Sequence, residues 1–202
     1  MSAQPTPAPM TPAEYLAWEA EQEFKSEYHE GEIFAMSGGS LKHARIAPNL
    51  SAMLRDAMRG RCGVFSSDLR VQLTERRYVY PDLTAVCGEP EVGPGDVLLN
   101  PSLVVEVLSP STEAFDRGTK TRLYLQIPSL VGLLLVSQDV PEVMVYSRTA
   151  AGGWEAISDD GARIRVPALG LDLALDDLYD GIDFGPNPMP DSLRERLATY
   201  AT

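Results

Sequence analysis

The chain has few of the side chains that most often bind zinc: its 202 residues include two cysteines and two histidines. The cysteines lack C-x-x-C spacing, so a zinc finger is excluded. Cys62 and Cys87 each stand in or beside an apolar segment, with no histidine nearby in the sequence. We therefore predict that both are reduced thiols in the core rather than metal ligands.

Long apolar segments are also missing. No stretch approaches the ~20 apolar residues that a helix needs to span a bilayer. The first 12 residues, MSAQPTPAPMTP, contain neither the basic start nor the apolar stretch of a secretory signal. We therefore predict a cytoplasmic protein with no membrane partner.

Several catalytic loops are absent as well. The sequence has no G-x-G-x-x-G or G-x-x-x-x-G-K-[ST] element, so cradling of phosphates by a nucleotide-binding loop has no support. A serine hydrolase would need a G-x-S-x-G elbow with histidine and acid partners, and neither histidine follows such a serine.

Basic charge is scarce, since 17 Lys and Arg stand against 29 Asp and Glu, a formal charge of -12. This balance argues against a surface wrapped around nucleic acid, so any polyanion site must be local. Residues 129–202 carry 12 acids and 5 bases, a net of -7, which leaves only -5 for residues 1–128. We expect a local basic surface in that first part, formed by Arg70, Arg76, Arg77, Arg117, Lys120 and Arg122.

One domain fits this length and composition. We predict a disordered tail at 1–10, a domain at 11–184, and a C-terminal tail or short helix at 185–202, with helix possible at 190–200. Thr11, Pro12 and Glu14 form a capping box for a first helix that ends near residue 21. Pro48 lies inside the amphipathic stretch 43–59, so that helix either begins near Pro48 or bends there.

The remaining pattern alternates between strands and helices and predicts an α/β (α+β) fold, with a mixed central sheet flanked by helices and an antiparallel β extension. Residues 24–34 are expected to form a hairpin that turns at Glu30-Gly31. Predicted strands follow at 64–73, 78–86, 103–108 and 130–137, a helix at 112–126, a short helix at 176–179, and the antiparallel extension at 143–166.

The most informative residues are Asp82 and Glu106. Asp82 follows Pro81 in a strand-like segment, and Glu106 interrupts the apolar strand Leu103–Leu108. A carboxylate buried in such a strand costs several kcal/mol unless it is paired, protonated or bound to a metal. Two carboxylates facing one pocket would suit Mg²⁺ or Mn²⁺. Alternatively, Asp82 caps a turn and Glu106 pairs with an arginine.

Lys120 is the third candidate. On a helix, Asp116, Lys120 and Tyr124 lie four residues apart and share one face. Either Lys120 forms an ordinary surface ion pair with Asp116, or the helix brings it over the pocket that holds the two acids. There it would stabilise phosphate charge or orient a water molecule.

These segments resemble a known family. The matching elements are Tyr80-Pro81-Asp82, the run Pro101–Thr112, and Asp116-Arg117-Gly118-Thr119-Lys120. They resemble the Uma2 (DUF820) family. Upstream, the segment Glu27–Ser37 followed by His43 resembles the opening segment of the same family. The resemblance covers about residues 11–180. It implies the PD-(D/E)XK restriction-endonuclease-like fold and the activity of an endonuclease.

Carried over to this sequence, the resemblance implies that Asp82, Glu106 and the Val107 carbonyl bind the catalytic metal, Mg²⁺ or Mn²⁺. The fold's motif usually has lysine two positions after the second acid, where this chain has Leu108. Lys120 on the next helix resembles a relocated lysine.

Two further residues support the predicted site. Glu27 is either an additional metal ligand, direct or through water, or an exposed acid beside Glu30 and Glu32. His43 either exchanges a proton near the phosphate or caps the helix. His29, Tyr80 and Tyr124 are treated as structural residues or as the wall of the pocket.

Together these observations predict a DNA endonuclease that depends on a divalent metal. The alternative is a nuclease-fold domain that no longer cleaves and serves as a binding or assembly module, which Leu108 and the acidic C-terminal third favour. A homodimer is expected in either case, with the strands between 143 and 166 as a possible partner surface.

Overall fold

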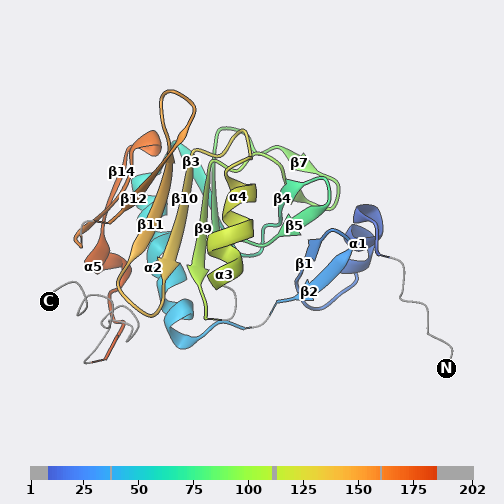
Figure 1. The fold of residues 1–202 in the computed structure, drawn as a ribbon, viewed down its shortest axis with the longest axis horizontal. Coiled ribbons are helices and arrows are strands. Elements are labelled where there is room, and N and C mark those ends of the chain that lie inside the picture. The colour runs from blue at the N-terminus through green and yellow to red at the C-terminus, as the bar shows by residue number, and fades with distance from the viewer. Residues whose placement is uncertain (1–8, 37, 111–112, 160, 186–202) are drawn as a thin grey trace, which may run out of the picture.

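The structure is a computed structural model, which describes residues 9–36, 38–110, 113–159 and 161–185 (Figure 1). The predicted tails at 1–10 and 185–202 lie outside the described residues except for residues 9, 10 and 185, and so does the predicted helix at 190–200. Met10 already belongs to the folded part, because its amide donates to the Gly31 carbonyl and its own carbonyl accepts from the Tyr28 hydroxyl. Among the described residues, no helix is both long and apolar enough to cross a membrane.

A mixed six-stranded sheet forms the centre of the molecule, as the sequence pattern predicts. β9 and β10 are parallel, and every other neighbouring pair is antiparallel. The strand order is β12 (Trp154–Ser158), β11 (Val143–Arg148), β10 (Gly132–Ser137), β9 (Leu103–Leu108), β6 (Leu83–Cys87) and β3 (Cys62–Ser66).

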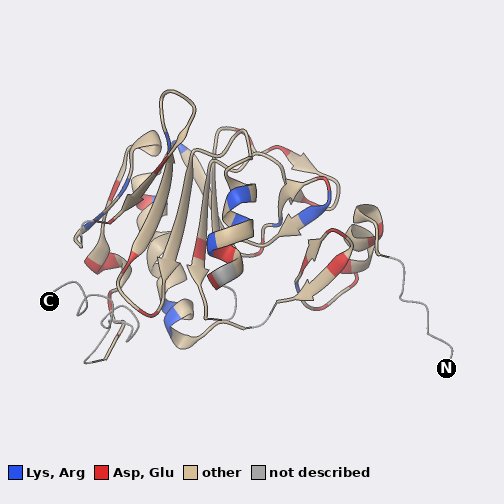
Figure 2. Ribbon diagram, in the orientation of Figure 1, with Lys and Arg blue, Asp and Glu red and all other residues tan. Residues whose placement is uncertain are grey.

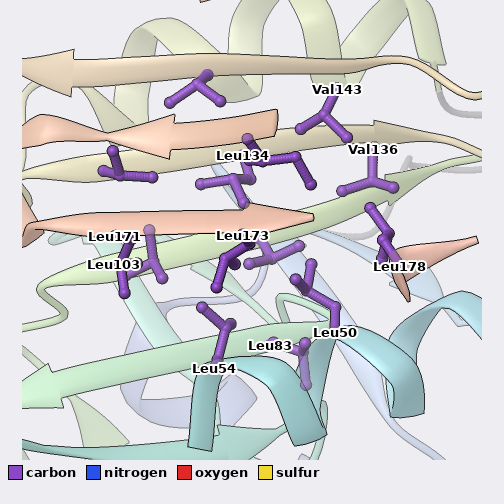
Figure 3. Close-up of a cluster of buried hydrophobic side chains, with 14 of the residues drawn as sticks. Leu50, Leu54, Leu83, Leu103, Leu134, Val136, Val143, Leu171, Leu173 and Leu178 are labelled. Carbon is purple, nitrogen blue, oxygen red and sulfur yellow. The ribbon is translucent and has the colours of Figure 1, made fainter. Parts of the chain in front are cut away.

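Both faces of this sheet are covered, so the residues of β9 and β10 are buried along their whole length. One face packs against α2 (Leu41–Ala57), the β13–β14 hairpin (Arg163–Val166 and Leu171–Ala174) and α5 (Leu175–Leu178) (Figure 3). The other face packs against α4 (Thr121–Tyr124) and the strand β4 (Val71–Thr74). Near-continuous apolar runs are typical of such doubly covered strands, and Glu106 is the exception.

A second sheet carries the N-terminal part of the chain. Its order is β2 (Glu32–Ala35), β1 (Ser26–His29), β5 (Arg77–Val79), β4, β8 (Val97–Leu98) and β7 (Val92–Gly93). Helix α1 (Pro12–Glu19) packs against it through Tyr15, whose ring stacks on those of Tyr28 and Tyr78. Both hydrogen bonds of the predicted capping box are present at the start of α1.

Two strands that the sequence predicts as continuous are divided between the two sheets. The predicted strand 64–73 is interrupted by a turn and becomes β3 and β4. The predicted strand 78–86 becomes β5 and β6, separated by Tyr80, Pro81 and Asp82. Proline has no amide to donate to a ladder, so the chain passes from one sheet to the other at this point.

The two predicted helices around the site differ in detail from expectation. α2 begins at Leu41, where the Ser40 hydroxyl accepts from the His43 amide, and Pro48 lies inside it. A helix start near Pro48 is therefore wrong, and His43 belongs to the first turn of α2. The predicted helix 112–126 consists, where described, of α3 (Glu113–Phe115), a π-helical turn η1 (Asp116–Lys120) and α4.

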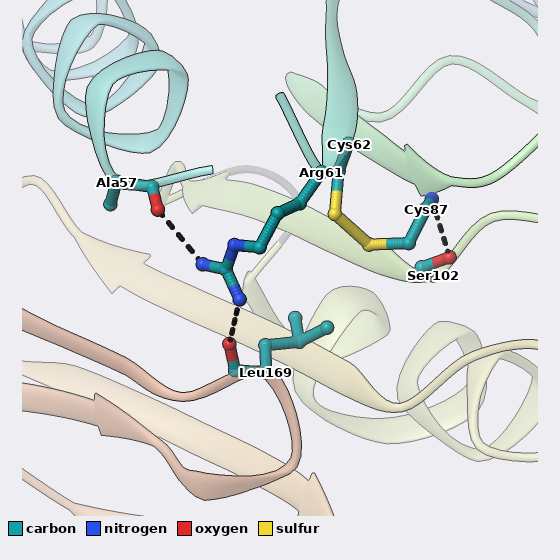
Figure 4. The surroundings of a disulfide bond; sticks show 6 residues. All are labelled: Ala57, Arg61, Cys62, Cys87, Ser102 and Leu169. Carbon is teal, nitrogen blue, oxygen red and sulfur yellow. Dashed lines mark hydrogen bonds between the residues drawn. A yellow bond between two sulfur atoms is a disulfide. The ribbon is translucent and has the colours of Figure 1, made fainter. Parts of the chain in front are cut away.

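The prediction of two reduced thiols is contradicted. Cys62 and Cys87 form a disulfide, with their Cα atoms 4.0 Å apart (Figure 4). They are direct partners in the antiparallel pair β3–β6, where the residues of a non-hydrogen-bonded pair approach most closely. This pairing depends on the sheet register, which their 25-residue separation in the sequence does not reveal.

We predict that removing this disulfide destabilises the fold. For a sequence separation of 25 residues, the loss of chain entropy in the unfolded state corresponds to about 3.5 kcal/mol. The Cys62→Ser/Cys87→Ser variant should lose about this much free energy of unfolding in a urea titration. Reductant should lower the stability of the parent to that of the variant and leave the variant unchanged. Two freely reactive thiols in the native parent without reductant would contradict the prediction.

Candidate active site

A cleft of about 700 Å³ lies where the two sheets, the start of α2 and the α3–η1 stretch meet. Figure 1 shows β9 and α3 in the middle of the molecule, with the β1–β2 hairpin to one side. All five side chains predicted for the site line this cleft: Glu27, His43, Asp82, Glu106 and Lys120.

Asp82 is held in place by both carboxylate oxygens. Its Oδ2 accepts from the Val107 amide at 2.6 Å, and its Oδ1 lies 3.0 Å from His43 Nε2. The hydrogen bond to Asp82 raises the pKa of His43 above its usual value, although burial opposes this shift. Asp82 therefore links the end of β9 to α2. The alternative, in which Asp82 only caps a turn, does not account for these two contacts.

Glu106 is 5% exposed and pairs with a lysine and a tyrosine, so the alternative in which it pairs with an arginine is wrong. Its Oε1 accepts from the Tyr124 hydroxyl at 2.5 Å and lies 2.9 Å from Lys120 Nζ. Burial raises the pKa of Glu106 to about 8, because the charged form is poorly solvated there and the Lys120 charge only partly compensates. The side chain is therefore largely protonated at neutral pH in the metal-free protein.

Lys120 is buried, 5% exposed, so the alternative of an ordinary surface ion pair is wrong. Its Nζ lies 2.9 Å from Glu27 Oε1, 2.9 Å from Glu106 Oε1 and 3.8 Å from Asp116 Oδ1. Burial favours the neutral amine, but the three carboxyl groups outweigh it and raise the pKa of Lys120. Lys120 is consequently an ammonium ion at neutral pH.

The position of Lys120 explains how the site accommodates Leu108. Along β9, residues 106 and 108 point to the same face of the sheet, because side chains alternate along a strand. Leu108 is buried among apolar residues on that face. Lys120 reaches the same face from the π-helical turn, a feature that occurs often at functional sites.

Glu27 faces the cleft from β1, so the alternative of an exposed acid is also wrong; its side chain is 14% exposed. Burial would raise its pKa, but interactions with His29 at 3.1 Å and Lys120 at 2.9 Å lower the pKa to about 2. The Tyr80 amide donates to Glu27 as well, at 3.4 Å.

Three contacts in the site are not predicted from the sequence. Tyr124 and His29, which are expected to be structural residues or part of the pocket wall, contact Glu106 and Glu27 directly. Asp116, which is expected only as a surface partner of Lys120, is buried and lines the cleft. The four-residue spacing of Asp116, Lys120 and Tyr124 was the available signal, and it indicated the shared face correctly without indicating what that face meets.

The expected local basic surface does not form. Arg70 is 7% exposed and buried against Glu19 and the Tyr80 hydroxyl. The other members also pair with carboxylates, except Arg122, which has no such partner in the described part of the chain. Arg76 and Arg77 pair with Glu30, Arg117 with Glu113, and Lys120 with the acids of the cleft. Figure 2 shows acidic segments in β9, in the α3–η1 stretch and in the β1–β2 hairpin.

Hard divalent cations such as Mg²⁺ and Mn²⁺ prefer carboxylate, carbonyl and water oxygens as ligands. In the described part of the chain, no group of three or more His, Cys, Asp or Glu side chains is arranged to hold a metal ion. Asp82 and Glu106 supply two carboxyl groups to one cleft. In an antiparallel ladder the N–H and C=O of one residue point to the same neighbour. The Val107 amide donates to Asp82 Oδ2, so this rule puts the Val107 carbonyl on the side of β9 that Asp82 occupies, and Val107 also lines the cleft.

Comparison with known proteins shows the family to which this chain belongs. The sequence model of the Uma2 family, described as "Putative restriction endonuclease", matches residues 12–176. The chain belongs to the Uma2 family. It is also 39% identical to the Synechocystis sp. protein slr1290 over 178 residues, 87% of this chain and 94% of that protein. A second Synechocystis sp. protein, sll1609, is 36% identical over 149 residues, 72% of this chain and 84% of its own.

A solved structure has the same fold as this Uma2 protein. It is a crystal structure from Anabaena variabilis, titled "a putative nuclease belonging to DUF820", with a TM-score of 0.66 and 22% identity. The match covers 85% of this chain and 98% of that one. The predicted family and fold class are thus confirmed, and the family supports a nuclease-like function.

The buried carboxyl group of this Uma2 protein should give stability a distinct pH dependence. Between pH 4.5 and about 8, the unfolded chain ionises Glu106 while the folded chain keeps its proton. The parent should therefore lose up to about 1.4 kcal/mol of unfolding free energy per pH unit over this range, relative to Glu106→Gln. Metal-free urea titrations from pH 4.5 to 9 measure the difference.

The difference should level off above about pH 8, where both states are ionised. Asp56→Asn is the matched control, because Asp56 is exposed and its one ion pair among the described residues is with the nearby Arg59. Parallel stability profiles for the parent and Glu106→Gln would contradict the assigned burial of the carboxyl group.

Proposed function

We propose that this Uma2 protein is a DNA endonuclease that depends on Mg²⁺ or Mn²⁺ and hydrolyses phosphodiester bonds. The observation that carries the proposal is a buried ammonium group, Lys120, within 2.9 Å of Glu106 and lining one cleft with Asp82. A charged lysine beside two carboxyl groups is costly to bury. Its presence in an accessible cleft is therefore better explained by catalysis than by stability.

Asp82, Glu106 and the Val107 carbonyl would hold the metal, since carboxylate and carbonyl oxygens suit Mg²⁺ and Mn²⁺. The ion, when bound, would activate a water molecule and offset charge on the phosphoryl group. Glu106 must release its proton to become a ligand. Tyr124, which donates to Glu106, fixes the orientation of that carboxyl group.

Lys120 and His43 would supply charge and protons. Because its pKa is raised, Lys120 is an electrostatic and hydrogen-bonding group rather than a base. It would orient water and stabilise the phosphate. His43, with a pKa raised by Asp82, would donate a proton near the leaving oxygen. Glu27 keeps the Lys120 ammonium in place, since their side chains are 2.9 Å apart.

The alternative is a nuclease-fold module that no longer cleaves, and one observation favours it: Lys120 is engaged by two carboxyl groups at 2.9 Å. A lysine held in this way must exchange a partner before it contacts phosphate. A parent protein that does not bind metal would support this alternative, whereas metal-dependent cleavage by the parent would exclude it.

A homodimer and a cytoplasmic location remain proposals. Within the described residues, β12 is an edge strand of the central sheet, and pairing through it would extend the sheet across two copies. The Cys62–Cys87 disulfide weighs against the cytoplasm, because disulfides are rare there.

Metal binding should be detectable as thermal stabilisation. A ligand that binds only the folded state raises its stability. Because Glu106 must lose a proton below its pKa of about 8, the apparent affinity for Mn²⁺ should rise about tenfold per pH unit from pH 6 to about 8. Asp82→Ala should abolish the stabilisation, and Asp56→Asn should retain it. A parent that millimolar Mg²⁺ and Mn²⁺ do not stabilise at any of these pH values would contradict the metal site.

Cleavage should depend on the same residues. With supercoiled plasmid and Mg²⁺ or Mn²⁺, Asp82→Ala and Glu106→Ala should nick at least about a hundredfold more slowly, because the metal contributes several kcal/mol to catalysis. Lys120→Met should also be impaired while still binding metal. Asp56→Asn serves as the control with full activity. Equal nicking by the parent and the acid variants would show that the site is misassigned.

A further inference from the structure

Two large aromatic side chains stand exposed at the proposed active-site cleft. Phe34, on β2, is 49% exposed, and Phe115, at the end of α3, is 39% exposed; both line the cleft. Single exposed apolar residues are ordinary on protein surfaces. Two exposed phenyl rings contributed by separate elements to a cleft that also holds four carboxyl groups need another explanation.

The two phenyl rings contact His29, which is linked through Glu27 to Lys120. Both contact the His29 ring edge to face, each with its centroid 5.3 Å from that of the histidine. His29 in turn lies 3.1 Å from Glu27, which contacts Lys120. The β1–β2 register also sets Phe34 directly opposite Glu27, on the same face of the hairpin. The rings therefore adjoin the proposed site of chemistry.

The charge of the cleft argues against binding through the phosphate backbone alone. Its lining includes the acids Glu27, Asp82, Glu106 and Asp116 and the bases Lys25 and Lys120. Lys120 is committed to carboxyl groups, and Lys25 lies 3.0 Å from Asp68. Affinity for duplex DNA comes largely from neutralised phosphates, and this cleft offers few basic groups for that purpose.

We propose that Phe34 and Phe115 form a stacking platform for unpaired bases, so that the substrate of this cleft is a single strand or a locally opened duplex. Aromatic side chains bind single strands by stacking on the base faces, which a paired helix does not expose. Stacking also needs no positive charge, so it suits a protein of net charge -12. The inference names the substrate class of the proposed nuclease and rests on that function.

Binding can be measured separately from cleavage. Fluorescence anisotropy in EDTA would compare a labelled single-stranded 20-mer, its duplex, an abasic strand of the same length, and the RNA strand of the same sequence. The parent should bind the single strand at least about tenfold more tightly than either the duplex or the abasic strand. Tight binding of either single strand, DNA or RNA, supports base stacking. The strand that binds more tightly shows whether the cleft prefers deoxyribose or ribose.

Phe34→Ala and Phe115→Ala should each weaken single-strand binding about tenfold and leave duplex binding unchanged. Phe34→Trp should retain the affinity, because it keeps an aromatic face. Phe24→Ala is the matched control: Phe24 is 52% exposed, contacts Trp18 and does not line the cleft. Thermal midpoints should stay within a few degrees of the parent, since both rings are exposed.

Equal affinity for the abasic strand, or unchanged binding by both alanine variants, would overturn the inference. Variants that lose self-association in sedimentation but keep their binding would show that the rings form an interface between copies. Failure of the nuclease proposal is distinguishable: Phe-dependent binding of single strands without metal-dependent nicking would contradict catalysis and support the platform.

Discussion

The Lys120 ammonium ion, removed from water, is the constraint on which the site depends. A buried charge is tolerated only when opposite charges and hydrogen bonds compensate for lost hydration. Here the compensation comes from Glu27 on β1, Glu106 on β9 and Asp116 on the same helical turn. Because these carboxyl groups belong to different parts of the fold, the need to surround one lysine ties the N-terminal sheet to the central sheet.

The same constraint shapes the chemistry. Burial, reinforced by the neighbouring carboxyl groups of Asp82, Asp116 and Glu27, raises the pKa of Glu106 to about 8, so this side chain keeps its proton at neutral pH in the metal-free protein. The acidic excess of the whole chain, and the pairing of most of its expected basic surface with carboxylates, leave little positive potential for a phosphate backbone. A divalent ion at the carboxyl groups and aromatic rings at the rim would offset this deficit by means that do not require surface lysines.

Sequence periodicity predicted most elements, because apolar spacing and capping residues act locally. The capping box at Thr11 and the buried strand around Glu106 are examples. The predicted continuous strands failed where the chain changes sheets, as at Pro81, since alternation alone does not indicate which sheet a strand joins. The thiol prediction for Cys62 failed for a related reason: its pairing with Cys87 is set by strand register.

By itself, the sequence determined that Asp82 and Glu106 needed an explanation, because an acid in an apolar strand is costly in any fold. It also determined that Lys120 shares a helical face with Asp116, since that follows from helix geometry. Only the tertiary structure decided that this face meets Glu106 and Glu27. Glu27 and Lys120 are 93 residues apart in the chain, and contact over such a separation depends on how the sheets pack.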